Sequence, residues 1–236
     1  METIAQSSLQ IKQRALAGLI LVGIAPTISV ITGFALKAGL IAAFVFIFTK
    51  LWIFGLPAYW YLKVEGGQRS YSTPQNGGWM VSTVLGIGMS IVIGIAYFLL
   101  GDLMIRSEDL AEILEPFGLT VPWKLAVGIL FWIFINSVLE EYVFRWFITS
   151  KLETLVGGKW RPILLSAAIF TLHHTIALAF FIDPLGNAIA SLGVFIGGVI
   201  FSWLYVQYRS VWVAWVAHAI ADVAIFTIAW QLIVGF

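Results

Sequence analysis

The sequence has no cysteine and few charged residues. Of its 236 residues, 13 are Lys or Arg, 12 are Asp or Glu, and 61% are hydrophobic. The lack of cysteine excludes disulfides, a thiol nucleophile and Cys-based metal sites. A soluble domain carries about a quarter charged residues, so a charged fraction of 11% excludes that class. A formal net charge of +1 leaves no basic surface for nucleic acid, and we expect no such partner.

Long apolar runs divide the chain into segments of the length that crosses a bilayer as a helix, and they lack the alternation of barrel strands. We therefore predict an all-α fold, a polytopic transmembrane helix bundle with about seven membrane spans, as a single integral membrane domain over residues 1–236. The first run is expected to be a retained span, because its apolar part is too long for a signal peptide. The predicted spans cover residues 15–36, 40–62, 79–100, 122–151, 162–183, 186–208 and 211–234.

Two further patterns concern the ends of the spans. Residues 101–121 are acidic and carry apolar residues at helical spacing, which predicts an amphipathic helix at the membrane interface. Lys and Arg gather in the loops on one side, which predicts a cytoplasmic N-terminus and an outside C-terminus. We expect a multi-pass protein of the bacterial inner membrane, although an organelle membrane also fits. The basic residues of the predicted cytoplasmic side are Lys12, Arg14, Lys63, Arg69, Lys151, Lys159, Arg161 and Arg209.

Three charged residues lie in the interior of the predicted span 122–151, away from Lys124 and Lys151 near its ends. A charge near the bilayer centre is costly, so such residues usually face a cavity and have a partner. Glu141 and Arg145 are four residues apart and share one helix face, so they can pair. Glu140 points about 100° away from Glu141. The pattern therefore leaves Glu140 to face a different group.

All three histidines also lie inside predicted spans. At about 1.5 Å per residue, Glu140, His174 and His218 lie roughly 15, 20 and 12 Å from the cytoplasmic ends of their helices. We predict that they meet in one cavity. His218 and Asp222 share a helix face, so the carboxylate could orient the imidazole, or both could ligate a metal. His173 points about 100° away from His174, and we expect it to be a packed or hydrogen-bonded helix residue.

Together these residues form three ordered motifs. The motifs resemble the signatures of the CPBP intramembrane protease family, which includes type II CAAX prenyl endopeptidases and bacteriocin-processing or immunity proteins. The resemblance covers about residues 120–230, the expected catalytic core. It implies a glutamate-dependent intramembrane endopeptidase that cleaves a membrane-anchored peptide or protein substrate, with a prenylated CAAX-type C-terminus as one option. The motifs are Glu140-Glu141-x-x-x-Arg145, Phe170-x-x-x-His174 and His218-x-x-x-Asp222.

The resemblance also implies roles. Glu140 is expected to activate a water as general base, and His174 to help position that water. His218 and the residue at position 222 are expected to stabilise the oxyanion. The supporting residues are Glu141, Arg145 and Phe170.

Position 222 carries Asp where the prenyl proteases usually carry Asn. An ionised Asp cannot donate a hydrogen bond. Asp222 is therefore protonated, orients His218 or ligates a metal.

Other mechanisms and functions stay open at this point. The favoured mechanism requires no cofactor, and the alternative is Zn²⁺ with an activated water, held by Glu140, His174, His218 and Asp222. Buried acids and histidines also fit a proton- or cation-coupled transporter, although the chain shows no repeat symmetry. A third alternative is a non-catalytic membrane immunity or interaction protein. In each case the lipid bilayer is an expected partner.

Overall fold

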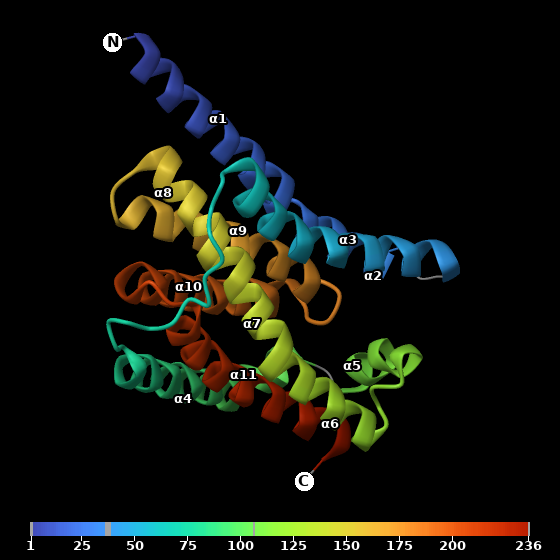
Figure 1. The fold of residues 1–236 in the computed structure, drawn as a ribbon. Helices are drawn as coiled ribbons and strands as arrows, with labels where there is room; N and C mark the ends of the chain where they lie inside the picture. The colour runs from blue at the N-terminus through green and yellow to red at the C-terminus, as the bar shows by residue number, and fades with distance from the viewer. Residues whose placement is uncertain (1, 36–38, 106, 236) are drawn as a thin grey trace.

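A computed structural model describes residues 2–35, 39–105 and 107–235, and it shows no strand within them. Figure 1 shows the helices packed into one bundle, with α1 extending away from it towards the N-terminus. Six helices in the described part are long and apolar enough to cross a membrane. The helix α3 (Gly39–Tyr59) occupies the second predicted span. The predicted all-α bundle of about seven spans is confirmed.

The first predicted span is broken by a proline. The helix α1 runs over Glu2–Gly23 and α2 over Ala25–Ala35, with a bend at Ile24. Pro26 lacks an N–H, and its ring clashes with the carbonyl four residues earlier, which explains the break. The predicted span 15–36 therefore starts well inside α1.

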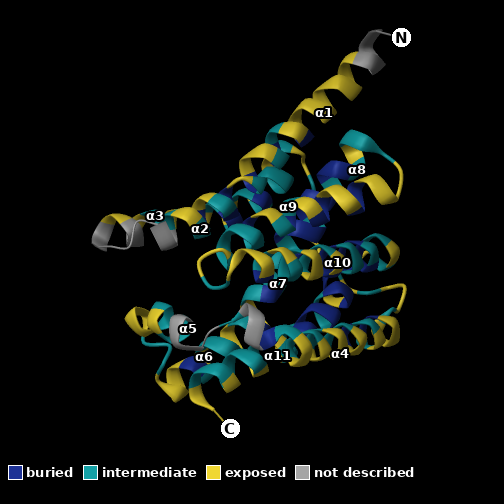
Figure 2. Ribbon diagram, turned by 180° about the vertical axis from the view of Figure 1, so that it is seen from behind, coloured by how far each residue is buried: buried dark blue, intermediate teal, exposed yellow. Residues whose placement is uncertain are grey.

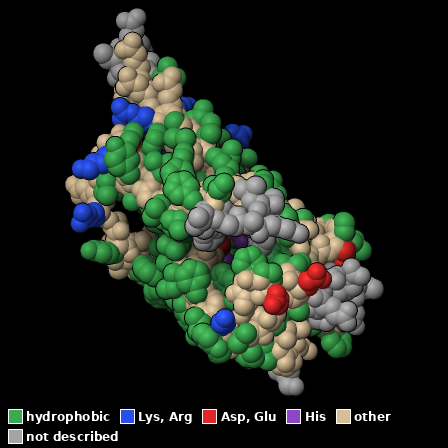
Figure 3. All heavy atoms as spheres, turned by 90° about the vertical axis from the view of Figure 1, so that its right-hand side faces the viewer, with side chains coloured by type: hydrophobic (Ala, Val, Ile, Leu, Met, Phe, Trp, Pro, Cys, Tyr) green, Lys and Arg blue, Asp and Glu red, His purple; other side chains and the backbone are tan. Residues whose placement is uncertain are grey.

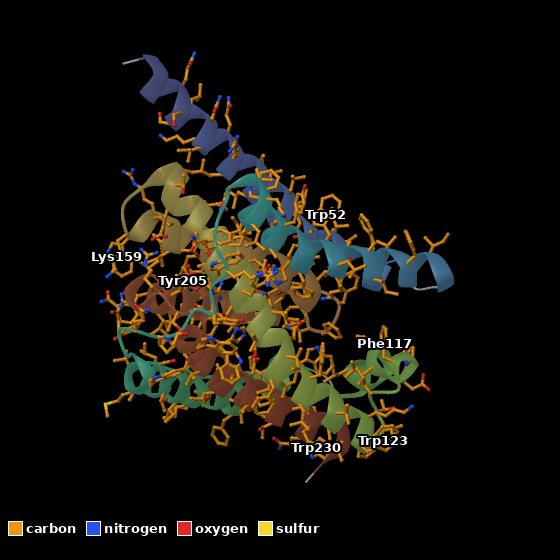
Figure 4. The ribbon with its side chains drawn as sticks, viewed as in Figure 1. Trp52, Phe117, Trp123, Lys159, Tyr205 and Trp230 are labelled. Atoms are coloured by element: carbon orange, nitrogen blue, oxygen red, sulfur yellow. The ribbon has the colours of Figure 1, made fainter. Side chains whose placement is uncertain are left out.

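The helix α3 is held against α1 by Trp52, which Figure 4 labels. The Nε1 of Trp52 donates to the carbonyl of Leu21 at 3.0 Å. The π-helical segment η1 (Trp60–Val64) then extends α3. The second predicted span, 40–62, thus matches α3 and most of η1.

The helix α4 (Trp79–Met104) packs closely along α11 (Val211–Val234). A Cβ on Gly86 would lie 2.9 Å from Cβ of Ile220, so a glycine is needed at this crossing. The hydroxyl of Ser90 donates to the carbonyl of Ile220 at 2.8 Å, and that of Ser82 donates to the carbonyl of Val213. These contacts fix the position of α11.

The loop between η1 and α4 also contacts α11, and it crosses the bundle in Figure 1. The hydroxyl of Ser72 accepts from the backbone N–H of Val211 at 2.9 Å. The carbonyl of Ser72 accepts from the hydroxyl of Ser210 at 2.6 Å. The carbonyl of Tyr71 accepts from Nε1 of Trp212 at 2.8 Å. The loop thus satisfies a donor in the first turn of α11.

The helix found within the predicted interfacial segment 101–121 is shorter than expected, because α4 continues to Met104. It contains α5 (Ser107–Leu114) and a 3₁₀ turn, η2 (Glu115–Phe117). Figure 4 shows Phe117, Trp123 and Trp230 towards the same end of the molecule. Aromatic residues are typical of a membrane interface.

The fourth predicted span belongs to one continuous helix of 35 residues, Pro122–Val156. At 1.5 Å per residue it is about 52 Å long, whereas the hydrocarbon core is about 30 Å thick. The helix therefore extends beyond the bilayer. Its segments are α6 (Pro122–Phe131), η3 (Trp132–Asn136), α7 (Ser137–Glu140), η4 (Glu141–Thr149) and α8 (Ser150–Val156).

The segment η4 is π-helical, and its widened turns displace backbone bonds. The carbonyl of Phe144 accepts from the hydroxyls of Thr149 at 2.8 Å and of Ser166 at 3.1 Å. Ser166 belongs to α9 (Trp160–Leu178), so these bonds also join two helices. The π-helix begins directly after Glu140.

The C-terminal helices complete the bundle. The helix α9 begins two residues before the start of the predicted span 162–183. It ends five residues before the end of that span, because the chain turns at residues 179–183. The helix α10 (Pro184–Tyr208) is capped by Asp183, whose side chain accepts from two backbone N–H groups. The bounds of α11 coincide with the predicted span 211–234. Figure 2 shows buried residues concentrated where the long helix meets α9, α10 and α11.

Ion pairs connect the last segment of the long helix, α8, to residues outside it at one end of the bundle. Lys151 pairs with Glu65 at 2.5 Å. Arg209 donates two hydrogen bonds of 2.8 Å to Glu153, and these bonds raise the pKa of Arg209. In Figure 3, most of the visible Lys and Arg side chains lie towards the N-terminal end and the visible acidic ones towards the other. The predicted membrane orientation stays a prediction.

Candidate active site

The residues predicted for catalysis lie together where the long helix meets α9 and α11. Oε2 of Glu140 is 3.7 Å from Nε2 of His218. The same nitrogen is 3.7 Å from Oδ1 of Asp222. Glu140 and His174 each place a ligand-type atom within 4.8 Å of the other. Three helices that are distant in sequence thus bring Glu140, His174, His218 and Asp222 to one place.

A single buried carboxylate, that of Glu141, connects two other site residues. Its Oε1 is 2.9 Å from Nδ1 of His218, and its Oε2 is 3.2 Å from Nε of Arg145. The side chains of Glu141 and Arg145 have no exposed surface. The expected pair with Arg145 is therefore present. Glu141 also orients His218 through Nδ1, whereas Asp222, one candidate for that task, lies near the opposite nitrogen.

Aromatic rings surround the guanidinium of Arg145. Its central carbon lies 4.3 Å from the ring centroid of Phe170 and 5.3 Å from that of Phe201. Such contacts stabilise a desolvated cation. Among the described residues, Nη1 and Nη2 of Arg145 have no hydrogen-bond acceptor. Phe201 also stacks on the ring of His218, with 4.6 Å between centroids, so these aromatic rings position both side chains.

His174 has a fixed tautomer. Its Nδ1 lies 2.8 Å from the carbonyl of Phe170, which can only accept, so Nδ1 carries the proton. The ring centroid of Phe170 is 4.3 Å from that of His174. When the imidazole is neutral, Nε2 is therefore the nitrogen that can act as an acceptor or ligand.

Asn136 is a contact of Glu140 that the motifs do not reveal. Its Nδ2 donates to Oε1 of Glu140 at 2.8 Å. The four-residue spacing places Asn136 and Glu140 on the same helix face, so the sequence allows this contact. A polar residue at that distance is equally typical of helix packing, so the spacing alone does not assign Asn136 to the site. Its neighbour Ser137 does have a packing role, since its hydroxyl bonds the carbonyl of Ile133 and accepts from Nε1 of Trp215.

His173 lies closer to the site than its sequence position indicates. Its ring stacks on Phe144 at 5.0 Å and lies 4.1 Å from the ring of His174. Rotation about the side-chain bonds brings the two imidazoles together despite the 100° between their positions on the helix. A ligand-type atom of His173 lies within 4.8 Å of those of Glu140 and His174. Among the described residues, the atoms spaced closely enough for a metal ion thus belong to Glu140, His173 and His174. The set expected from the sequence had His218 and Asp222 in place of His173.

A groove on α3 lies beside the site. It has a volume of about 280 Å³ and is almost entirely apolar. The hydroxyl of Tyr142, which follows the two glutamates, donates to the carbonyl of Phe54 at 3.0 Å. Figure 3 shows histidine and acidic side chains in a recess between hydrophobic side chains. The residues that line the groove are Ile47, Lys50, Leu51, Phe54 and Gly55.

Comparison with known proteins gives one match. Residues 122–224 match the family described as type II CAAX prenyl endopeptidase Rce1-like. This range contains the three motifs. No curated protein and no solved structure matches the chain. Residues 122–224 of this integral, multi-pass membrane protein therefore match an Rce1-like type II CAAX prenyl endopeptidase domain, which supports a protease of the CAAX type.

Proposed function

We propose that the protein hydrolyses a peptide bond of a membrane-anchored protein, with Glu140 as the general base. The observation that carries the proposal is the 3.7 Å separation between Oε2 of Glu140 and Nε2 of His218. A base and a potential donor thus lie side by side, so the attacking water and the carbonyl oxygen of one substrate bond can each contact one of them. Such a pairing is what acyl transfer to water requires.

The first step is the activation of water. Asn136 engages Oε1 of Glu140, so Oε2 is available to take a proton from the water. The Nε2 of His174 accepts a hydrogen bond from the second O–H of the same water, because its Nδ1 proton is held by Phe170. No metal is required for this step.

The second step is stabilisation of the oxyanion. As an imidazolium, His218 donates a hydrogen bond from Nδ1–H to Oε1 of Glu141 and presents Nε2–H to the developing negative charge. The tetrahedral intermediate then collapses as the C–N bond breaks, and protonated Glu140 transfers its proton to the leaving amine. Asp222, 3.7 Å from the same Nε2, donates a further hydrogen bond in its protonated form.

The substrate approaches along the groove on α3. Its apolar surface suits the aliphatic residues or lipid anchor of a CAAX-type C-terminus. Lys50 lies close enough to Glu140 to interact with it electrostatically, and its charge is complementary to a C-terminal carboxylate. We therefore favour substrates cleaved near a free, prenylated C-terminus.

The test uses purified protein in lipid nanodiscs with a membrane-anchored peptide library, and mass spectrometry of the new termini. Glu140→Gln keeps the size of the side chain and removes the base, so cleavage should fall by about 10²- to 10⁴-fold. Glu153→Gln is the control, since this carboxylate pairs with Arg209 outside the site. Equal cleavage by wild type and Glu140→Gln would refute the proposal.

A further inference from the structure

We propose that an anionic phospholipid binds at the start of α9, with its phosphate on Lys159 and Arg161 and an acyl chain along the outer face of that helix. The place lies next to the turn between α8 and α9, at the end of the bundle where α8 forms its ion pairs. About 22 Å of helix separates Lys159 from His174. The inference is therefore independent of the proposed chemistry.

Two glycines make the turn and bring Lys159 beside the end of α10. The φ angles of Gly157 and Gly158 are +62° and +72°, a region that other residues rarely adopt, so the chain reverses directly after α8. Nζ of Lys159 donates to Oε1 of Gln207 at 3.0 Å and lies 5.9 Å from the ring centroid of Trp203. Figure 4 shows Lys159 at the edge of the bundle. Two uncharged side chains thus hold the ammonium in place without neutralising it.

The charges of Lys159 and Arg161 are available to an external anion. Both side chains are exposed, and among the described residues no carboxylate pairs with either of them. Glu153, the acidic residue of α8, already accepts two hydrogen bonds from Arg209. An ammonium and a guanidinium so close in sequence can donate to different oxygens of one phosphate. Basic pockets between membrane helices bind anionic headgroups in this way.

Apolar side chains continue from the two cations along α9. Leu165, Ala168 and Leu172 are exposed, and their spacing places them on the same helix face as Arg161. From Leu165 to Leu172 this face is about 10 Å long. Trp160, between the two cations, is 56% exposed, and indole rings are enriched at the membrane–water interface. Headgroup contacts followed by a surface for an acyl chain favour a lipid over a soluble phosphate.

The bound lipid also has an effect on stability. Lys159 directly precedes α9 and contacts α10 through Gln207, so a headgroup on this side chain ties the two helices together. Gly198 of α10 packs closely on Ala167 of α9, where a Cβ would lie 3.2 Å from Cα of Ala167. A ligand that binds only the folded state raises its stability by mass action. We therefore expect the lipid to stabilise this pair of helices.

The experiment titrates phosphatidylglycerol into the whole chain in detergent micelles, and native mass spectrometry counts the lipids that stay bound. The wild type should retain one lipid. Lys159→Gln/Arg161→Gln should lower the affinity by about thirtyfold, from the contribution of two basic residues at an anionic headgroup. Lys63→Gln/Arg69→Gln is the matched control, since it removes the same charge from two exposed residues elsewhere. Its affinity should change by less than about threefold, because salt screens charges that do not contact the headgroup.

Two competitors and a stability measurement complete the test. Neither phosphatidylcholine, whose headgroup has no net charge, nor inorganic phosphate, which has no acyl chain, should displace the bound lipid. In nanodiscs, added phosphatidylglycerol should raise the melting temperature of the wild type and the control but not of Lys159→Gln/Arg161→Gln. Unfolding in phosphatidylcholine alone checks that both variants are folded.

Three results would overturn the inference. Equal loss of affinity in both double variants would show diffuse attraction to an anionic surface. Undiminished retention of lipid by Lys159→Gln/Arg161→Gln would place the lipid elsewhere on the protein. Displacement by inorganic phosphate would assign the two cations to a soluble anion.

Discussion

Nδ1 of His218 lies 2.9 Å from Oε1 of Glu141, and the other oxygen of that carboxylate lies 3.2 Å from Nε of Arg145. Adjacent glutamates on one helix therefore have different tasks. Glu141 faces the protein interior and fixes the imidazole, whereas Glu140 lies on the other side of the same ring. The two acids of the first motif thus approach His218 from its two nitrogens.

The buried pair of Glu141 and Arg145 can be tested by separating stability from activity. Arg145→Met should destabilise the protein by about 3–5 kcal/mol, because it leaves a buried carboxylate without its cation. Glu141→Leu/Arg145→Met should recover much of this stability but not activity, since His218 then has no acceptor. Glu141→Gln/Arg145→Met should recover both in part, because a Gln oxygen can still accept from Nδ1.

Thermal unfolding and cleavage, measured on the same nanodisc samples, check this prediction. Equal activity of the two double variants would show that Glu141 does not act by orienting His218.

Asp222 should act as a hydrogen-bond donor. If so, Asp222→Asn retains most of the cleavage rate, because an amide donates without needing a proton from solution. Asp222→Leu, which has no donor, should lower kcat by about 10²- to 10³-fold, as the loss of an oxyanion donor does. A steady-state comparison of kcat distinguishes the two variants. Strong loss in Asp222→Asn would instead assign the negative charge of Asp222 to catalysis.

Chelation should leave basal cleavage unchanged. The proposed water activation uses Glu140 and His174 without an ion, so treatment with EDTA or 1,10-phenanthroline removes nothing that the reaction needs. The measurement is the initial rate before and after chelation, with metal content determined by mass spectrometry. Loss of activity that zinc restores would identify a metalloprotease and reject the glutamate-base mechanism.

The groove on α3 should govern substrate binding. Leu51→Trp places a larger side chain in the groove and should raise KM by about tenfold, equivalent to about 1.4 kcal/mol of binding, with a smaller effect on kcat. Ile87→Trp is the matched control, because Ile87 is exposed on α4. An unchanged KM in Leu51→Trp would place the substrate path elsewhere.

Much of the helical layout was available from the sequence. The run of residues 211–234 has a polar turn before it and few interruptions, so its bounds match α11. The first span was predicted less well, because the effect of Pro26 is local whereas hydrophobicity is averaged over a window. The helix therefore bends at Ile24 inside an apolar run that looks continuous.

The site was predictable as a set of residues but not as a set of contacts. Spacing and depth indicated that Glu140, His174 and His218 could meet. They did not indicate that Glu141 would contact His218, because the helical spacing paired Glu141 with Arg145 and left Glu140 to face another group. The position of the His173 ring also depends on side-chain rotation and on its packing against Phe144. Helical spacing predicts neither of these.

The contacts that hold α11 have a consequence for the smallest active unit. The first turn of this helix is bound by Tyr71 and Ser72, and its middle packs on Gly86. All three residues precede the range 122–224 that matches the family. A fragment that starts at residue 122 would lose the contacts that place His218, so the candidate site depends on upstream segments that carry none of its motifs.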